Sequence, residues 1–350
     1  MVTHNEKCTI CKEREANKTN SHLISDFIVK MVASVDGEPS RDKGLLYEFL
    51  LKGIIEIMIP RGVSPEVLEE SFGNLKETVL CGGYRTIVAK DYIFCSECEK
   101  RLGKFLESPY ANTLVCNKKI VADMHYFFWL SIIWRISKFR IFSLDLPTHI
   151  IESLGKRLNA YLNAKNNNED LSHIMCNLPF GYSVIYCKDF SLYGNGGILA
   201  EYDKKEKTLL LILGDFVLYA YFSKHKRLRL AEKYGLGDIF AKAPTYNDLH
   251  KEQRQNVDSE ILQFMYGRVV EMFQEEYIQA REQIISFLWV VTRMKEAYLP
   301  IAPSDEFLGF VRNELYRGNA RSGEKSRIEF VVRTFCKGLK KIYGIEMSER

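Results

Sequence analysis

The chain has 350 residues, of which 46% are hydrophobic and 27% are charged. This composition is typical of a globular protein with a large core, and it excludes disordered and fibrous proteins. The net charge of +4 is the small difference between 49 basic and 45 acidic residues, so charge alone does not indicate a nucleic-acid-binding protein.

The N-terminal residues, MVTHNEKCTICKEREANK, are polar and contain no apolar central stretch. We therefore expect no secretory signal peptide and a cytoplasmic location. The two most apolar stretches, Tyr126–Ile133 and Thr208–Phe222, are too short or too interrupted for the about 20 apolar residues of a membrane-spanning helix. No membrane partner is expected.

Residues 1–115 are predicted to form an N-terminal domain with a helical insertion over residues 38–75. Apolar residues recur at helical spacing from Ser40 to Ile59. Ser64-Pro65 then has the composition of the start of a second short helix, because proline is favoured at the first helical position. Two short strands are expected before the next cysteine pair, at Thr86–Ala89 and Tyr92–Phe94.

Residues 116–350 are predicted to form a second, mostly helical domain. The segment Ile120–Phe142 is hydrophobic on almost all sides and predicts a buried helix, and His149–Leu162 predicts another. Over residues 183–222, β-branched and aromatic runs separated by turn residues predict an antiparallel β-meander. Its strands are expected at Ser183–Lys188, Gly197–Tyr202, Thr208–Leu213 and Phe216–Phe222.

The last third of the chain predicts three helices. Asp258 or Ser259 can cap the first, which is long, and Ser304 can cap the second, which runs to Tyr316. Ser326 and Glu329 form the capping box of a terminal helix that ends at Gly344. The fold class is therefore α+β, with a small zinc-binding module at the N-terminal end.

Four of the nine cysteines form two close pairs. Two residues separate the members of each pair, a spacing that lets both sulfurs reach one tetrahedral ion. Two such pairs complete a site with no open position, which indicates a structural zinc ion that contributes to folding. The four residues are Cys8, Cys11, Cys95 and Cys98. The alternative interpretation is a set of unrelated cysteines.

The remaining cysteines lie in mostly apolar sequence, where thiols usually act as small hydrophobic side chains. We expect these five to be buried and unligated: Cys81, Cys116, Cys176, Cys187 and Cys336. An odd total of nine cannot be paired completely in disulfides, which favours metal binding in a reducing compartment.

Three motifs accompany the cysteine pairs: Ser21-His22-Leu23-Ile24-Ser25 after the first, Glu99 directly after the second, and Ser131-Ile132-Ile133-Trp134-Arg135-Ile136-Ser137 in the apolar helix. Together they resemble the HNH, or ββα-metal, endonucleases, which contain a treble-clef zinc knuckle. Within this superfamily the chain is most similar to uncharacterised bacterial proteins that share the SHIIP, CxxCE and SxxWRxS motifs. The resemblance covers roughly the first 140 residues.

The resemblance implies a metal-dependent endonuclease that cleaves DNA rather than RNA, in a context of anti-phage defence. His22 would take a proton from the attacking water, a task that suits the pKa of a free histidine, about 6.5. A Mg²⁺ or Mn²⁺ ion, separate from zinc, would stabilise the departing oxygen. Glu99 would be a ligand of that ion, although the family usually has histidine or asparagine on this helix.

Two other functions remain open at this point. The chain could be a non-catalytic zinc-knuckle protein that binds nucleic acid, or a regulatory protein whose C-terminal helices pack on a protein partner. Arg135 lies in an apolar helix, so its charge requires a carboxylate, a phosphate or solvent, and a structural carboxylate is the more common partner. The sequence does not define the oligomeric state.

Overall fold

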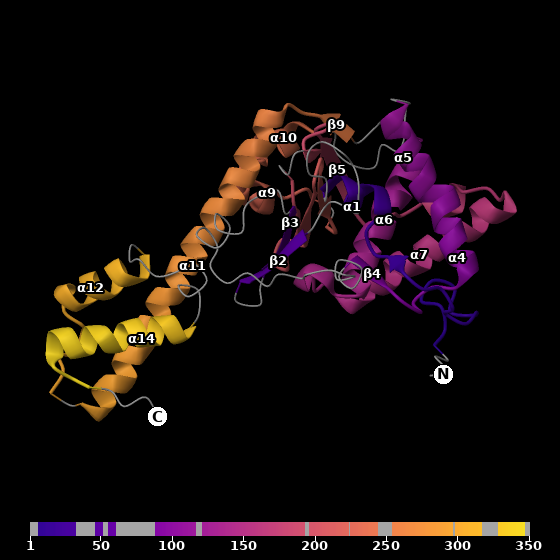
Figure 1. The fold of residues 1–350 in the computed structure, drawn as a ribbon. Helices are drawn as coiled ribbons and strands as arrows, with labels where there is room; N and C mark the ends of the chain where they lie inside the picture. The colour runs from indigo at the N-terminus through magenta and orange to yellow at the C-terminus, as the bar shows by residue number, and fades with distance from the viewer. Residues whose placement is uncertain are drawn as a thin grey trace. The chain divides into compact units, whose positions relative to one another are not determined.

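The computed structural model describes residues 6–32, 46–51, 55–60, 88–116, 121–192, 196–223, 225–243, 254–296, 298–316 and 328–346. These residues belong to two compact units, of which unit 1 extends to Tyr266 and unit 2 contains the described residues from Gly267 onward. Figure 1 shows the elements of both units. None of the described helices combines the length and apolarity needed to cross a membrane.

The expected domain boundary near residue 115 does not separate the two units. One hydrophobic core includes Cys8 and Leu106 on one side of that position and Phe128 and Leu218 on the other. Burial of apolar side chains from both segments in a shared core joins them into one folding unit.

The N-terminal part of unit 1 consists of short elements. They are β1 (Ser21–His22), α1 (Asp26–Val32), β4 (Ala89–Lys90), α4 (Ser96–Leu102), the π-helix η1 (Gly103–Glu107) and α5 (Ser108–Val115). Strands β1 and β4 pair antiparallel, with Ser21 opposite Lys90 and His22 opposite Ala89. The predicted strand Tyr92–Phe94 does not form, because Tyr92 has a φ of +56°, outside the β region.

The predicted helix from Ser40 to Ile59 is wrong for the residues that the structure describes, and residues 61–75 of the predicted insertion lie outside them. The described residues of this segment form strands β2 (Leu46–Leu51) and β3 (Ile55–Pro60), which pair antiparallel. Short apolar runs fit the periodicity of a helix and of a strand equally well. Here β3 pairs with β6, and this contact with a distant part of the chain favours the strand. Ser64-Pro65 and Thr86 lie outside the described residues.

A seven-stranded sheet forms the centre of unit 1, in the order β2-β3-β6-β7-β8-β5-β9. Its remaining strands are β5 (Gly181–Tyr186), β6 (Ile198–Asp203), β7 (Thr208–Leu213), β8 (Phe216–Tyr221) and β9 (Arg254–Asn256). The four predicted central strands are confirmed. Strands β6, β7 and β8 form a meander, whereas β5 pairs with β8 and with the parallel strand β9.

Two long helices connect the N-terminal elements to the sheet. Both were predicted, and they form as α6 (Ala122–Lys138) and α7 (Thr148–Asn167). Helix α6 is buried over almost its whole length. A Cβ atom on Gly155 of α7 would lie 2.7 Å from Nε1 of Trp134, so glycine permits the close approach of the two helices.

Shorter elements complete unit 1. They are the 3₁₀ turn η2 (Ile141–Ser143), α8 (Ser172–Met175), α9 (Arg229–Lys233) and α10 (Gly237–Lys242). Strands β5, β7 and β8 are buried at every position, as is typical of a sheet with both faces covered. On one face Tyr219 contacts Phe240 of α10, and on the other Phe216 contacts Trp129 of α6.

Unit 2 contains helices only, among the residues described. The long helix α11 (Ser259–Lys295) passes from unit 1 into it, followed by α12 (Asp305–Tyr316), α14 (Ile328–Gly338) and the π-helix η4 (Leu339–Tyr343). The predicted cap at Ser304 is confirmed, because its hydroxyl accepts a hydrogen bond from the Phe307 amide at 3.2 Å. Gly344 ends the last helix with a φ of +71°, as predicted.

Candidate functional site: a four-thiol metal centre and a buried polar network

The first cysteine pair lies in a tight turn formed by residues 7–15, which we call the knuckle. Lys7 and Glu15 form a β-bridge at its base. Within the turn, the Cys8 amide donates to the Arg14 carbonyl and the Lys12 amide donates to the Cys8 carbonyl, both at 2.8 Å. These bonds hold the two thiols of the pair on one side of the turn.

The second pair is positioned by the start of α4. Cys95 is the N-cap residue, and its sulfur accepts a hydrogen bond from the Cys98 amide at 3.4 Å. A backbone hydrogen bond from Thr9 to Ile93 joins the chain around it to the knuckle, and another from Lys18 to Phe94 joins it to the residues just after the knuckle, each 3.0 Å long. The helix start and the knuckle therefore present their thiols to each other.

All four sulfurs lie within 4.8 Å of one another. The Sγ atoms of Cys11 and Cys95 are 4.0 Å apart. Four sulfurs placed tetrahedrally at about 2.3 Å from a zinc ion would be separated by roughly 3.8 Å, so only small movements are needed to bind one. Cys8, Cys95 and Cys98 are buried and Cys11 is half-buried, as expected for a closed structural site. These residues fit a zinc ion with four thiolate ligands.

Protons are shared unequally among the thiols. A hydrogen bond from the Cys98 side chain lowers the pKa of Cys8 to about 4. The same bond, together with burial, raises the pKa of Cys98 above its ordinary value, and burial raises the pKa of Cys95. A bound ion must displace the protons that remain, so its affinity is expected to fall in acid.

A basic residue lies beside the thiols. The Arg14 side chain is exposed and hydrogen-bonds to Cys95, which raises the pKa of the guanidinium. Four thiolates around a zinc ion carry a net negative charge, which a neighbouring guanidinium partly balances. Arg14 was not identified from the sequence, because basic residues are common in polar turns.

The other cysteines differ from expectation. Cys187 is buried, as predicted, and burial raises the pKa of its thiol. Cys336 is half-buried, whereas Cys116 and Cys176 are exposed, so the prediction of buried thiols is wrong for these two. Both exposed cysteines directly follow a short helix, α5 and α8. Cys81 lies outside the described residues.

His22 is the last residue of β1 and is half-buried. Its Nε2 lies 3.5 Å from Oδ1 of Asp26, the first residue of α1. The other carboxylate oxygen of Asp26 forms an ion pair with Lys30 at 2.8 Å. A carboxylate in this position can orient an imidazole and stabilise its protonated form. Asp26 was not identified from the sequence. Whether its side chain reaches His22 depends on the turn between β1 and α1, which the sequence alone does not define.

Glu99 occupies the first turn of α4. Burial raises the pKa of its carboxyl group, although the charge of Arg135 opposes this effect. The buried hydroxyl of Ser21 is a hydrogen-bond partner of this carboxyl group and also lowers its pKa. Within the same residues, the four cysteines are the one group of three or more histidine, cysteine or acidic side chains that could hold a metal ion. The catalytic roles of His22 and Glu99 therefore stay predictions.

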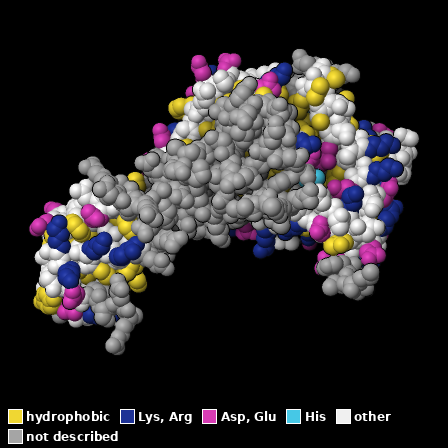
Figure 2. All heavy atoms as spheres, viewed as in Figure 1, with side chains coloured by type: hydrophobic (Ala, Val, Ile, Leu, Met, Phe, Trp, Pro, Cys, Tyr) yellow, Lys and Arg dark blue, Asp and Glu magenta, His cyan; other side chains and the backbone are white. Residues whose placement is uncertain are grey.

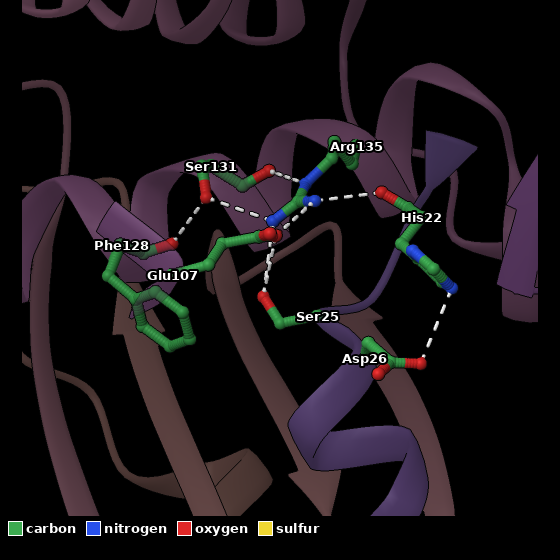
Figure 3. A network of polar contacts seen from close by, with 7 residues as sticks. All are labelled: His22, Ser25, Asp26, Glu107, Phe128, Ser131 and Arg135. Atoms are coloured by element: carbon green, nitrogen blue, oxygen red, sulfur yellow. Dashed lines mark hydrogen bonds and ion pairs between the residues drawn. The ribbon is translucent and has the colours of Figure 1, made fainter. Parts of the chain in front are cut away.

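Arg135 forms the centre of a polar network next to His22 (Figure 3). The side chain is 1% exposed, and its Nη1 donates to the carboxylate of Glu107 and to the backbone carbonyl of His22, both at 2.8 Å. Its Nε and Nη2 donate to the carbonyl and the hydroxyl of Ser131, each at 3.2 Å. The prediction that Arg135 pairs with a carboxylate is confirmed.

Glu107 connects the network to the start of α1. Its Oε1 also accepts a hydrogen bond from the hydroxyl of Ser25 at 2.9 Å. The Arg135–Glu107 pair thus contacts one residue at the end of β1, His22, and another just before α1, Ser25 (Figure 3). In this way a buried ion pair fixes the segment that determines the distance between His22 and Asp26.

Comparisons with known proteins identify no relative. No family model, no curated protein and no solved structure matches the chain.

Proposed function

We propose that this chain is a zinc-stabilised, HNH-type endonuclease that acts on DNA. The observation that carries the proposal is the order of elements around the four thiols: a knuckle with one cysteine pair, the antiparallel pair β1–β4, and a helix that begins at the second pair. This order supports the proposal of a treble clef, a fold in which the first strand of the hairpin carries the histidine in these endonucleases. His22 is the last residue of β1.

The proposed reaction is hydrolysis of a phosphodiester bond. Neutral His22 takes a proton from a water molecule, whose oxygen then attacks the phosphorus. Asp26, 3.5 Å from the imidazole, orients the ring and stabilises the imidazolium that forms. A bound Mg²⁺ or Mn²⁺ would supply stabilisation of the departing oxygen, and Glu99 would contribute one of its ligands.

The test is incubation of the pure protein with plasmid DNA and Mg²⁺ or Mn²⁺. We expect nicking or linearisation that is lost in His22→Ala and retained in His173→Ala, which removes an exposed histidine from α8. Zinc content, measured by atomic emission, should be the same in all three proteins. Equal cleavage by the wild type and His22→Ala would overturn the role of His22.

A second function is favoured by one observation. In the described part of the chain no cluster of metal ligands other than the four thiols occurs, and a hydrolytic Mg²⁺ site requires several oxygen ligands. The second function is non-catalytic binding of nucleic acid or of a protein partner on the same zinc-stabilised frame. It is supported if wild type and His22→Ala are equally inert but bind DNA with a steep dependence on salt. A role in anti-phage defence rests on the resemblance alone.

A further inference from the structure

A small hollow lies beside the metal centre, where the knuckle, the end of α6 and the middle of α7 meet. Its volume is about 200 Å³. The lining residues are Thr9, Ile10, Cys11, Lys12, Trp134, Lys138, Ile151, Glu152, Gly155, Lys156 and Asn159. Trp134 and Gly155 lie in close contact, as described above, so the two helices form a fixed wall.

Three lysines from three separate elements line this hollow. Lys12 belongs to the knuckle, Lys138 ends α6, and Lys156 lies in α7. All three are exposed, and none forms an ion pair with a residue that the structure describes. Glu152 is the one acidic residue in the lining. Glu152 offsets one of the three lysine charges, so lysines outnumber acidic residues in the lining.

Figure 2 shows Lys and Arg side chains, with acidic side chains among them, at the right-hand edge of the view, over the part of unit 1 where Figure 1 places α4 and α7. Local concentration of cations in a recess raises the potential more than the same charges do on a convex surface. The small net charge of +4 for the chain does not prevent such a local field.

Size restricts the ligand further. Pockets that enclose drug-sized organic molecules are usually about 300–1,000 Å³, so a hollow of about 200 Å³ suits a smaller, strongly charged group. Lysine ammonium groups bind phosphate as point charges without the strict geometry that arginine requires. The amide of Asn159 also lines the hollow, and its Nδ2 group can donate a hydrogen bond to a phosphate oxygen.

We propose that this hollow is a phosphate-binding pocket and that it holds a backbone phosphate of nucleic acid next to the metal centre. The choice of nucleic acid as the source rests on the proposed function, whereas the phosphate chemistry rests on the lysines. The pocket is distinct from His22, which does not line it. It contributes affinity rather than cleavage, because contacts to phosphate position a nucleic acid without reading its sequence.

The test is a binding titration of fluorescent duplex DNA, followed by anisotropy, in several salt concentrations. We expect the triple variant Lys12→Gln, Lys138→Gln, Lys156→Gln to bind about 10- to 100-fold more weakly than wild type at 0.1 M salt. The slope of log K against log salt should become shallower by roughly 1 to 2, since each phosphate contact contributes about 0.9. The proposal is overturned if the slope and affinity do not change.

A matched control separates this pocket from overall charge. The variant Lys205→Gln, Lys207→Gln, Lys242→Gln removes three exposed lysines of unit 1 that do not line the hollow. It carries the same net charge as the test variant and should bind DNA within about threefold of wild type. An equal loss in both variants would mean that only net charge matters, and would overturn the pocket.

Two further titrations distinguish the source of the phosphate. Inorganic phosphate and a mononucleotide are each titrated into the wild type and the triple variant, and binding is measured by calorimetry. If the triple variant binds duplex DNA like wild type but has lost a mononucleotide site, the pocket holds a free phosphate ester, and the backbone assignment is overturned. If DNA binding depends on the three lysines but no cleavage occurs, the phosphate pocket is supported and only the proposed endonuclease activity is overturned.

Discussion

The N-terminal region and the central sheet of unit 1 are stabilised by different interactions. In the N-terminal region, residues 6–32 meet residues 88–107 at four thiols and at the Arg135–Glu107 ion pair, which hydrogen-bonds to His22 and Ser25. In the sheet, strands β5, β7 and β8 are buried at every position and consist mainly of apolar residues. Both regions contribute to one core, so the difference lies in what holds the backbone in place, not in how deeply it is buried.

This difference indicates how each region should respond to its environment. Thiolate ligation depends on a metal ion and on pH, and a buried ion pair depends on both partners being present. Burial of apolar strands depends on neither. The N-terminal region, which carries His22, is therefore the part of unit 1 that loss of a metal ion or of one ion-pair partner should disturb most.

Removal of the metal should have the largest effect. Chelation, or Cys98→Ser, should abolish zinc binding. In hydrogen exchange, amides of the knuckle and of the start of α4 should lose their protection, whereas those of strands β7 and β8 should stay protected. The zinc-binding free energy of zinc-finger peptides, about 10–16 kcal/mol, is the upper limit of the stability lost. Cys176→Ser, at an exposed thiol outside the cluster, should leave zinc content and exchange unchanged. Loss of protection throughout the sheet would contradict the separation of the two regions.

Arg135→Met should have the next largest effect. It removes the cation from a site that is 1% exposed, so the Glu107 carboxylate loses its counter-charge and the His22 carbonyl loses the Arg135 donor. Breaking a buried pair in this way costs about 3–5 kcal/mol in the free energy of unfolding, measured by urea titration. The control is Arg227→Met, whose exposed guanidinium forms an ion pair with Glu206 that should contribute no more than about 1 kcal/mol. Similar losses in both variants would show that the network is not specially stabilising.

Glu107→Gln should have a smaller effect than Arg135→Met. The amide keeps an oxygen that can accept hydrogen bonds from Arg135 and Ser25, but it removes the negative charge. We expect a loss of about 1–3 kcal/mol in urea unfolding. If Glu107→Gln and Arg135→Met destabilise equally, the charge of Glu107 rather than its hydrogen bonds holds the network together.

Asp215 is the buried charge of the sheet region, and it provides the smallest and most specific test. Its Oδ1 accepts hydrogen bonds from the amide and hydroxyl of Ser191, whereas Oδ2 is buried with no partner in the described part of the chain. Burial raises the pKa of Asp215 above its ordinary value of 3.8. The folded protein therefore binds more protons than the unfolded chain between those two pKa values, and stability falls as pH rises through that window.

Comparison with Asp215→Asn isolates this effect. The free energy of unfolding of wild type, minus that of the variant, should decrease as pH rises from 3.8 and become constant above the raised pKa. Urea titrations between pH 4 and 8 measure it, and subtraction cancels changes in the metal centre that both proteins share. A difference that increases with pH would show that the ionised carboxylate is favoured by the fold.

Local sequence signals were sufficient for much of this structure. Helix α6 is apolar on almost all sides, turn residues separate β6, β7 and β8, and Ser304 and Gly344 mark helix ends. The spacing within each cysteine pair likewise indicated the metal centre before its geometry was known. In each case a few neighbouring residues carry the signal, so no knowledge of distant contacts is needed.

Features that depend on distant contacts were not predictable in the same way. Residues 46–60 fit either periodicity, and they form strands where Ile57 pairs with Leu199. Glu107 has no motif of its own, and it acquires a role because α6 brings Arg135 to it. The same is true of the lysine-lined hollow, whose members Lys12, Lys138 and Lys156 come from three separate elements.

The separation of the cysteine pairs has a consequence for synthesis of the chain. Cys11 and Cys95 are 84 residues apart, so a ribosome that adds about 5–20 residues per second needs roughly 4 to 17 s to progress from one to the other. During that time the first two thiols have emerged or are emerging without their partners. The nascent chain must keep them reduced, and a metal ion captured early has only half of its final ligands. All four thiols are therefore present only after β2 and β3 have been translated, and before β6, the other partner of β3, exists.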